Sequence, residues 1–165
     1  MIEGEAVVLR PIRRDVASAL LEGRQPAGLV FADGYPSEFS LEVMDLLAGP
    51  RAATPDGEGF HPCFVVRKED DVVVGEIGCS RSGPTARVGY SIVASCQGRG
   101  YATDALRALL MSLRADPRVG QITAETPVAH GASRRVMEKA GMRLCEERLG
   151  EVDGELVELA VYEAA

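Results

Sequence analysis

Hydrophobic residues in the middle of the chain follow two different spacings. Between residues 102 and 113 they recur every three or four positions, which predicts a helix with one buried face. This stripe consists of Ala102, Ala105, Leu106, Leu109, Leu110 and Leu113. Runs rich in β-branched residues predict strands at 63–67, 72–79 and 87–93 before the helix and at 121–126 after it. A polar segment separates the first two strands and indicates an antiparallel hairpin.

The N-terminal part of the chain carries weaker patterns. Residues 5–10 alternate between apolar and polar and then meet a proline, which predicts a first strand. Helical segments are expected at 15–21 and 40–47, with a turn at 34–37 between them. Glycines and prolines gather at 49–59 and predict a long loop, a kind of segment that often carries function in small domains.

The C-terminal part predicts a short helix followed by a hairpin. The helix has apolar residues spaced at three and four positions and ends at Gly141, a good left-handed cap. Strands at 143–149 and 156–162 are joined across Asp153 and Gly154. Together the elements predict an α/β (α+β) fold with a mixed, mostly antiparallel central sheet and helices on both faces. A chain of 165 residues accommodates one such domain, so residues 1–165 are expected to form it.

The composition is that of a soluble globular protein, with 46% hydrophobic and 26% charged residues. No apolar stretch approaches the roughly 20 residues that span a bilayer, and Met1 to Glu5 lack the basic flank of a secretory signal. We therefore expect a cytoplasmic protein with no membrane partner. The cysteines lack the paired spacing of zinc sites, so no metal is expected and buried reduced thiols are predicted. They are Cys63, Cys79, Cys96 and Cys145.

The acidic charge balance limits the range of partners. There are 25 acidic and 18 basic side chains, for a formal charge of −7. A nucleic acid bound through its phosphates is therefore disfavoured. The charge suits a cationic partner, and plain solubility explains it equally well.

The segment from Cys96 to Thr103 joins a predicted strand to the long helix through glycines. At such a junction the first N–H groups of the helix lack internal partners and the helix dipole is positive, so the loop can hold phosphate oxygens. Gly98 and Gly100 allow the backbone to approach, and Arg99 adds positive charge. Many helices simply begin after glycines, which is the structural alternative. The segment lacks the lysine ending of a P-loop and the context of a dinucleotide-binding fingerprint.

What remains is the pattern Q/R-x-x-G-x-G/A, with Gln97, Gly100 and Ala102 in register. With this pattern the chain resembles the GNAT superfamily of N-acetyltransferases, most strongly over residues 72–149. The preceding strand and the segment 126–142, similar to P-x-N-x-x-S-x-x-V-x-E-K-x-G-F, support the resemblance. The most similar branch contains ribosomal-protein N-terminal acetyltransferases. The resemblance implies a GNAT-like domain that uses acetyl-coenzyme A as cosubstrate and needs no metal.

The resemblance also implies how the cosubstrate is held. The strand that ends at residues 91–93 diverges from the strand at 121–126 in this family, and its free backbone groups bind pantetheine while one N–H holds the thioester oxygen. Ordinary pairing of the two strands is the alternative. The residues expected to contact coenzyme A are Ser91, Ile92, Val93, Gln97, Gly98, Arg99, Gly100, Tyr101, Ala102, Thr103, His130 and Ser133.

Two positions near the start of the short helix that ends at Gly141 have competing interpretations. Ser133 matches the serine that lies near the sulfur in this branch, where it protonates the leaving thiolate, and a cap at the helix start is the alternative. His130 stands where the family usually has asparagine, so it is either a contact to coenzyme A or a surface histidine.

Two departures concern the acid and the base. Met137 occupies the position where many relatives have an acidic tyrosine, and Arg87 the position where others have a basic glutamate. Glu76 and Glu125 are the nearest substitutes for the base by strand position, and solvated strand residues are the alternative for both.

The expected activity is transfer of an acetyl group to a primary amine, which attacks the thioester directly while both substrates are bound. The amine belongs to a small molecule or to a peptide N-terminus. An acyl-coenzyme A sensor without turnover and a purely structural interaction domain are the alternatives. Exposed strands at the end of the sheet favour a homodimer.

Overall fold

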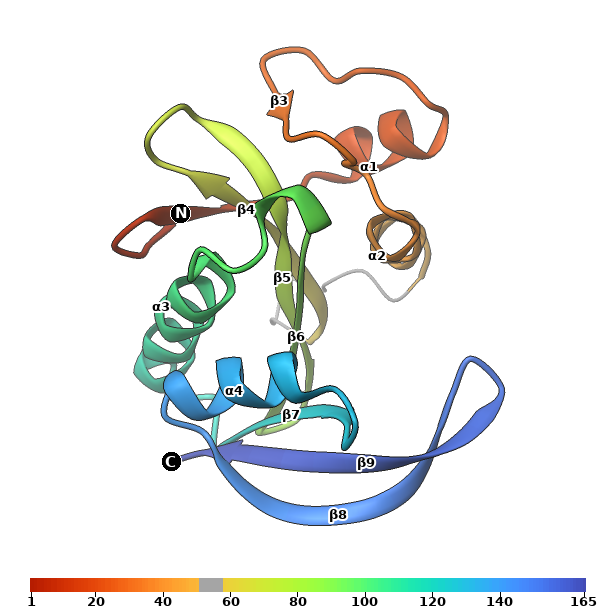
Figure 1. The fold of residues 1–165 in the computed structure, drawn as a ribbon. Coiled ribbons are helices and arrows are strands. Elements are labelled where there is room, and N and C mark those ends of the chain that lie inside the picture. Colours follow the sequence, from red (N-terminus) through yellow and green to blue (C-terminus); the bar gives the residue numbers. More distant parts are fainter. Residues whose placement is uncertain (51–57) are drawn as a thin grey trace.

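The computed structural model describes residues 1–50 and 58–165, which form one sheet with helices on both faces (Figure 1). Its strands are β1 (Ile2–Glu3), β2 (Val7–Pro11), β3 (Val30–Phe31), β4 (Gly59–Arg67), β5 (Val72–Ser82), β6 (Thr85–Ile92), β7 (Gln121–Pro127), β8 (Arg143–Val152) and β9 (Glu155–Ala164). The helices are α1 (Arg14–Leu21), α2 (Glu38–Ala48), α3 (Tyr101–Ala115) and α4 (Gly131–Lys139), with the single 3₁₀ turn η1 (Ala94–Cys96) before α3. The predicted fold class is confirmed.

The main path of the sheet runs β1-β2-β4-β5-β6-β7-β9-β8. Every neighbouring pair on this path is antiparallel except β6 and β7, which run parallel. The short strand β3 adds a second parallel pairing, to β5. A parallel pair needs a crossover, and α3 supplies it between β6 and β7. This places the N-terminus of α3 directly after the end of β6.

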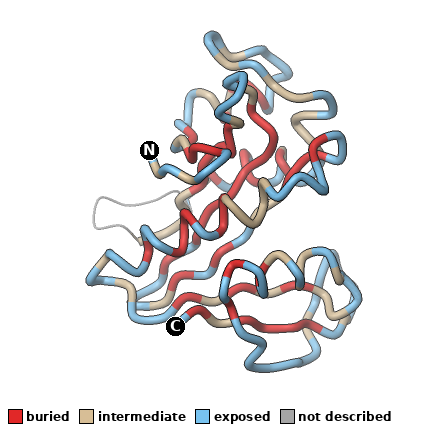
Figure 2. The backbone as a smooth tube through the Cα atoms, turned by 60° about the vertical axis from the view of Figure 1, so that its left-hand side comes forward, coloured by how far each residue is buried: buried red, intermediate tan, exposed pale blue. Residues whose placement is uncertain are grey.

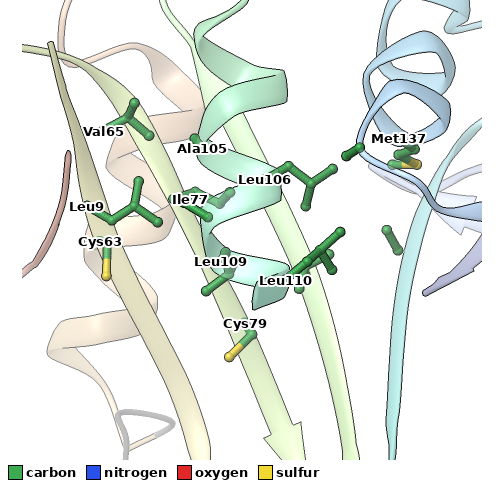
Figure 3. Packing of buried hydrophobic residues seen from close by; sticks show 14 of the residues in the cluster. Leu9, Cys63, Val65, Ile77, Cys79, Ala105, Leu106, Leu109, Leu110 and Met137 are labelled. Carbon is green, nitrogen blue, oxygen red and sulfur yellow. The ribbon is translucent and has the colours of Figure 1, made fainter. Parts of the chain in front are cut away.

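Each face of the sheet buries its own apolar cluster. On one face α3 and α4 pack on the central strands, with Leu106 and Leu110 completely buried (Figure 3). On the other face α1 and α2 cover a second cluster that includes Met44 and Phe64. Figure 2 shows the buried residues concentrated in the central strands, whereas β8 is exposed along almost its whole length.

The helix starts follow from local sequence. Ser37 and Ser40 form a capping box at the start of α2, in which the side chain of each bonds the backbone N–H of the other. The residue before α3 is Gly100, whose φ of 82° suits glycine and leaves no side chain over the first turn. Helix α3 begins at Tyr101, at the predicted junction.

Several sequence expectations need correction. Strands β1 and β3, of two residues each, were not expected, because strands that short show no periodicity. Strand β4 starts at Gly59, within the expected loop at 49–59, and residues 51–57 of that loop lie outside the described residues. Cys145 is exposed where a buried thiol was expected, because it lies on β8, the strand at the end of the sheet, which is exposed along almost its whole length. No helix in the described parts of the chain is long and apolar enough to cross a membrane.

Candidate active site

Strands β6 and β7 separate partway along their length (Figure 1). Their parallel pairing runs from Thr85 opposite Gln121 to Val88 opposite Ala124 and stops there. The last residues of β6 remain paired with β5 alone. Within the described chain, no strand pairs with the β7-facing edge of β6 beyond Val88. The predicted divergence of the two strands is therefore confirmed.

The direction of the backbone groups shows which of them face this opening. The N–H of Val93 bonds the carbonyl of Val74 on β5, at 3.0 Å. Because successive residues of a strand point their N–H groups to opposite edges, Ser91 faces β5 as well, whereas Tyr90 and Ile92 face the opening. The N–H of Ile92 is therefore the best placed to receive a thioester oxygen.

This geometry corrects the expectation for Val93. Both of its backbone groups are used within the fold, since its carbonyl accepts the N–H of Cys96 at 2.9 Å. The carbonyl of Ser91 also points toward β5, where it stands so close to Gly75 that a Cβ there would lie 2.0 Å away. Of the three strand residues expected to offer free backbone groups, only Ile92 does so toward the opening, and it offers its N–H alone, because its carbonyl accepts the side-chain amide of Gln97.

The loop after β6 is open and free of side-chain cover. Gly98 and Gly100 have φ values of 76° and 82°, and a Cβ on either would meet no atom within 4 Å. All four residues from Gln97 to Gly100 are exposed, and Arg99 forms no ion pair with the described residues. The side-chain amide of Gln97 donates to the carbonyl of Ile92 at 2.9 Å. Gln97 therefore ties the loop to the strand end, a structural role beside the expected contact to coenzyme A.

The first turn of α3 presents backbone donors at the same place. Tyr101, Ala102 and Thr103 are half-buried there, and helix geometry leaves their N–H groups without internal partners. Asp104 in this turn is turned away from the loop. Its carboxylate accepts the N–H groups of the β1–β2 turn, those of Glu5, Ala6 and Val7, at 2.8 to 3.0 Å. The one acidic side chain of the turn therefore anchors the N-terminal hairpin.

The start of α4 lies on the other side of the opening. His130 is the residue before the helix, and its Nδ1 accepts the N–H of Ser133 at 3.1 Å. His130 therefore performs the capping role that was the structural alternative for Ser133. Arg134 and Glu138 fix the helix to β9 through the hydroxyl of Tyr162, at 3.0 and 2.9 Å.

Ser133 meets a residue that the sequence analysis did not single out. The hydroxyl of Tyr90 lies 3.0 Å from its Oγ and donates to its backbone carbonyl at 3.1 Å. A tyrosine hydroxyl has one proton to donate. Because Tyr90 donates it to the backbone carbonyl of Ser133, the Ser133 hydroxyl is the donor in the bond between the two side chains. Burial raises the pKa of Tyr90, and the hydrogen bond to Ser133 offsets part of this increase. Met137, at the position of the family's tyrosine acid, is buried in the core.

A pocket of about 200 Å³ lies under α2, on the face opposite α4. Helix α2 covers it with Phe39, Val43 and Leu46, and Phe60 and Pro62 of β4 close one side. Its floor is formed by β5 and β6, where Gly78 and Gly89 stand opposite each other. The pocket borders the same part of β6, residues 89 and 90, that begins the opening toward β7.

Glu76 is the buried acidic group of this pocket, which corrects its interpretation as a solvated strand residue. Only 2% of the residue is exposed, and the hydroxyl of Ser40 donates to Oε1 at 3.2 Å. Burial raises the pKa of Glu76 to about 7, although the neighbouring hydroxyls of Ser40 and Tyr35 lower it. Oε2 and the Tyr35 hydroxyl have no hydrogen-bond partner of good geometry among the described residues. A buried carboxyl with one free oxygen is suited to bind a proton or an amine.

Glu125 lies on the same face of the sheet as Glu76 but has different partners. Its carboxylate pairs with the guanidinium of Arg148, and Arg87 stands 3.8 Å away as a second cation. The side chain of Arg87 is 63% exposed and lines the pocket under α2. Both neighbouring cations therefore engage the carboxylate of Glu125 in ion pairs. Of the two candidate bases, Glu76 alone lines the pocket.

Comparison with known proteins identifies the family. Residues 6–143 match the acetyltransferase (GNAT) domain family, and the chain belongs to it. No curated protein matches the chain.

Solved structures support the same fold, with sequence identities too low to indicate more. A GNAT-family acetyltransferase from Bacillus anthracis superposes with a TM-score of 0.70 at 18% identity, covering 99% of this chain and 96% of that one. RimL, a ribosomal L7/L12 α-N-protein acetyltransferase in complex with coenzyme A, has a TM-score of 0.71 at 17% identity, with coverage of 99% and 96%. A chimera of the spermidine N-acetyltransferase SpeG from Vibrio cholerae and hSSAT has a TM-score of 0.70 at 14% identity, with coverage of 96% and 95%.

Proposed function

We propose that this protein transfers the acetyl group of acetyl-coenzyme A to a primary amine while both substrates are bound. The observation that carries the proposal is the position of residues 89 and 90 of β6, which border two sites at once. On one side they line the opening that leads to the loop before α3. On the other side they form part of the floor of the pocket under α2. A cosubstrate in the opening and an acceptor in the pocket would meet at this strand.

The cosubstrate side is built from backbone donors. The pyrophosphate would lie at Gly98 to Gly100 and on the first turn of α3, where unpaired N–H groups and the helix dipole favour phosphate. Arg99 would add a charge-assisted hydrogen bond. The thioester would lie in the opening beside Ile92, whose N–H would stabilise the negative charge that develops on the carbonyl oxygen.

The acceptor side supplies the base. Glu76 pairs in register with Ser91, the residue next to Ile92, which supports a position of its carboxyl group near a thioester held at Ile92. With a pKa of about 7 it takes a proton from an ammonium group at neutral pH, directly or through a water. The neutral amine then attacks the thioester carbon, and the nitrogen gives up a second proton to solvent as the tetrahedral intermediate collapses, because Glu76 already holds the first.

The leaving group needs a proton as the carbon–sulfur bond breaks. Ser133 would supply it, since its hydroxyl lies on α4 across the opening and is held by Tyr90. Rotation of this hydroxyl from the Tyr90 oxygen to the sulfur would allow Ser133 to protonate the thiolate. The Tyr90 hydroxyl would then return a proton to Ser133 and recover one from solvent. This relay assigns Tyr90 a positioning role that no sequence motif indicated.

Calorimetry with acetyl-coenzyme A and an assay of released thiol with a panel of amines test the proposal. Saturable binding together with amine-dependent thiol release is the expected result. Binding without release for any amine would instead support an acyl-coenzyme A sensor. Absence of binding by a folded protein would exclude both and leave a structural interaction domain.

A further inference from the structure

The charged groups around the pocket under α2 are arranged unevenly. Glu76 lines the pocket and pairs with Ser91 across the two strands, and Ser80 and Arg87, which pair in the same way, both line it. The two pairs are four residues apart along the strands, about 13 Å at the rise of an extended chain. Glu76 therefore marks the end next to the opening, and Arg87 marks the far end. A ligand lying along the pocket would meet a carboxyl group at one end and a guanidinium at the other.

The floor between these ends is bare backbone. Gly78 must be glycine, because a Cβ there would lie 2.7 Å from the carbonyl oxygen of His61. Gly89 opposite it is different, since a Cβ there would meet no atom within 4 Å. Its missing side chain leaves space in the pocket. With Phe39 and Leu46 above, the middle of the pocket fits an uncharged carbon chain.

Arg87 belongs to a cluster with excess positive charge. The carboxylate of Glu125 is paired closely with Arg148 and only at 3.8 Å with Arg87, so two cations share one anion. Arg87 and Glu125 lie on the pocket face, because Arg87 pairs with Thr123 and Glu125 is two residues further along the same strand. In a protein with a formal charge of −7, a local excess of one positive charge next to a pocket favours an anion.

From this arrangement, and resting on the proposed function, we propose that the acceptor is a primary amine that also carries a carboxylate several bonds away. The amine lies at Glu76 beside the opening, the carbon chain crosses Gly78 and Gly89, and the carboxylate binds Arg87. The pocket volume of about 200 Å³ corresponds to roughly seven non-hydrogen atoms at about 30 Å³ each. The class therefore comprises short ω-amino acids and compact peptides with a comparable separation of charges.

Among the described residues, Glu42 is the third charged side chain that lines the pocket, and it defines the main competing acceptor. It forms no ion pair within the described residues, so it offers a carboxylate to a second ammonium group. A diamine would use Glu42 together with Glu76 and would be repelled by Arg87. Three amines of equal chain length distinguish an acceptor with a carboxylate, an acceptor with no second charge and a diamine. They are 5-aminopentanoate, pentylamine and 1,5-diaminopentane.

The test measures kcat/KM for these three amines at saturating acetyl-coenzyme A. The wild-type protein should prefer 5-aminopentanoate over pentylamine by about fivefold, the upper range for an exposed ion pair. In Arg87→Gln this preference should fall to about one. Arg24→Gln is the matched control, because it removes another exposed arginine paired with a carboxylate and should keep the preference. High salt should reduce the wild-type preference, as screening predicts.

A second measurement keeps the inference testable if no amine is acetylated. In the presence of coenzyme A, calorimetry compares binding of 5-acetamidopentanoate with that of N-pentylacetamide, which differ in the carboxylate. About fivefold tighter binding of the anion, lost in Arg87→Gln, supports the inference even where turnover fails. Equal binding, or a preference for the diamine or pentylamine in turnover, overturns it and leaves the proposed acetyltransferase activity standing.

Discussion

The two sides of strand β6 form their parts of the site from different kinds of groups. Toward α3 and α4, the candidate cosubstrate site consists mainly of backbone: Ile92 in the opening and the glycine loop at Gly98 and Gly100, exposed and without covering side chains. Toward α2, the candidate acceptor pocket consists of side chains, with Glu76 buried among apolar residues. A backbone site depends on local chain conformation. A side-chain site depends on which distant residues the fold brings together.

The largest expected effect tests the backbone side. Gly100→Glu should lower the affinity for acetyl-coenzyme A by more than about 10³-fold, because it places a carboxylate where several charge-assisted hydrogen bonds to phosphate, each worth about 1.5–3 kcal/mol, would form. Gly154→Glu is a close control, since Gly154 has a φ of 81° against 82° at Gly100 and similarly open surroundings, but lies in the β8–β9 turn. Both variants carry the same backbone strain, so calorimetry of the two separates strain from phosphate repulsion. Equal affinities of the two variants for acetyl-coenzyme A would show that the loop before α3 does not bind the pyrophosphate.

The next largest effect tests the acceptor pocket under α2, which is built from side chains. Glu76→Gln should lower kcat/KM for the amine by up to about 10³-fold, because the amide cannot accept the proton of the attacking amine. Glu125→Gln should change it little, since Glu125 is engaged by Arg148. Both are measured by thiol release with the same amine. A larger loss in Glu125→Gln than in Glu76→Gln would reverse the assignment of the base.

The buried carboxyl of Glu76 should also appear in the pH dependence of folding. Its pKa is raised from 4.5 to about 7, so between these values the folded chain holds a proton that the unfolded chain has released. The contribution of Glu76 to the free energy of unfolding should therefore be greatest below about pH 4.5. It should fall by up to about 3 kcal/mol as the pH rises to 7 and above. Urea unfolding of wild type and Glu76→Gln across this range measures the difference. Parallel curves for the two proteins would mean that Glu76 is not protonated in the fold.

A smaller effect is expected where the two sides meet, at the Tyr90–Ser133 pair. Ser133→Ala should lower kcat by roughly 10²-fold with little change in the KM for acetyl-coenzyme A. Tyr90→Phe should lower kcat by about tenfold, because Ser133 keeps its proton but loses the group that orients it. If the relay is real, the double variant is no slower than Ser133→Ala alone. Full activity with reduced thermal stability in Tyr90→Phe would instead make the pair purely structural.

The smallest effect concerns His130. Its Nδ1 caps α4, so His130→Ala should reduce the free energy of unfolding by about 1 kcal/mol. The kcat and the KM for acetyl-coenzyme A should stay unchanged, since the ring nitrogen already has a partner within the fold. A raised KM without loss of stability would restore the contact to coenzyme A that the sequence position suggested.

Local sequence determined the parts of this protein that depend on neighbouring residues. The spacing at 102–113 and the glycines before it predicted helix α3 and the loop before it, because periodicity and the φ of glycine act over a few residues. The turn at Asp153 and Gly154 was predicted for the same reason. The divergence of β6 and β7 came from the family resemblance, and the pairing pattern bears it out.

Only the tertiary structure decided the rest. Glu76 and Ser40 are 36 residues apart, and the burial that shifts the Glu76 carboxyl exists only when α2 packs on β5. Tyr90 and Ser133 are 43 residues apart and meet only because α4 lies beside β6. The engagement of Val93 with Val74 likewise depends on strand pairing. Burial, pKa and hydrogen-bond partners are properties of the packed chain, and one sequence position carries no record of them.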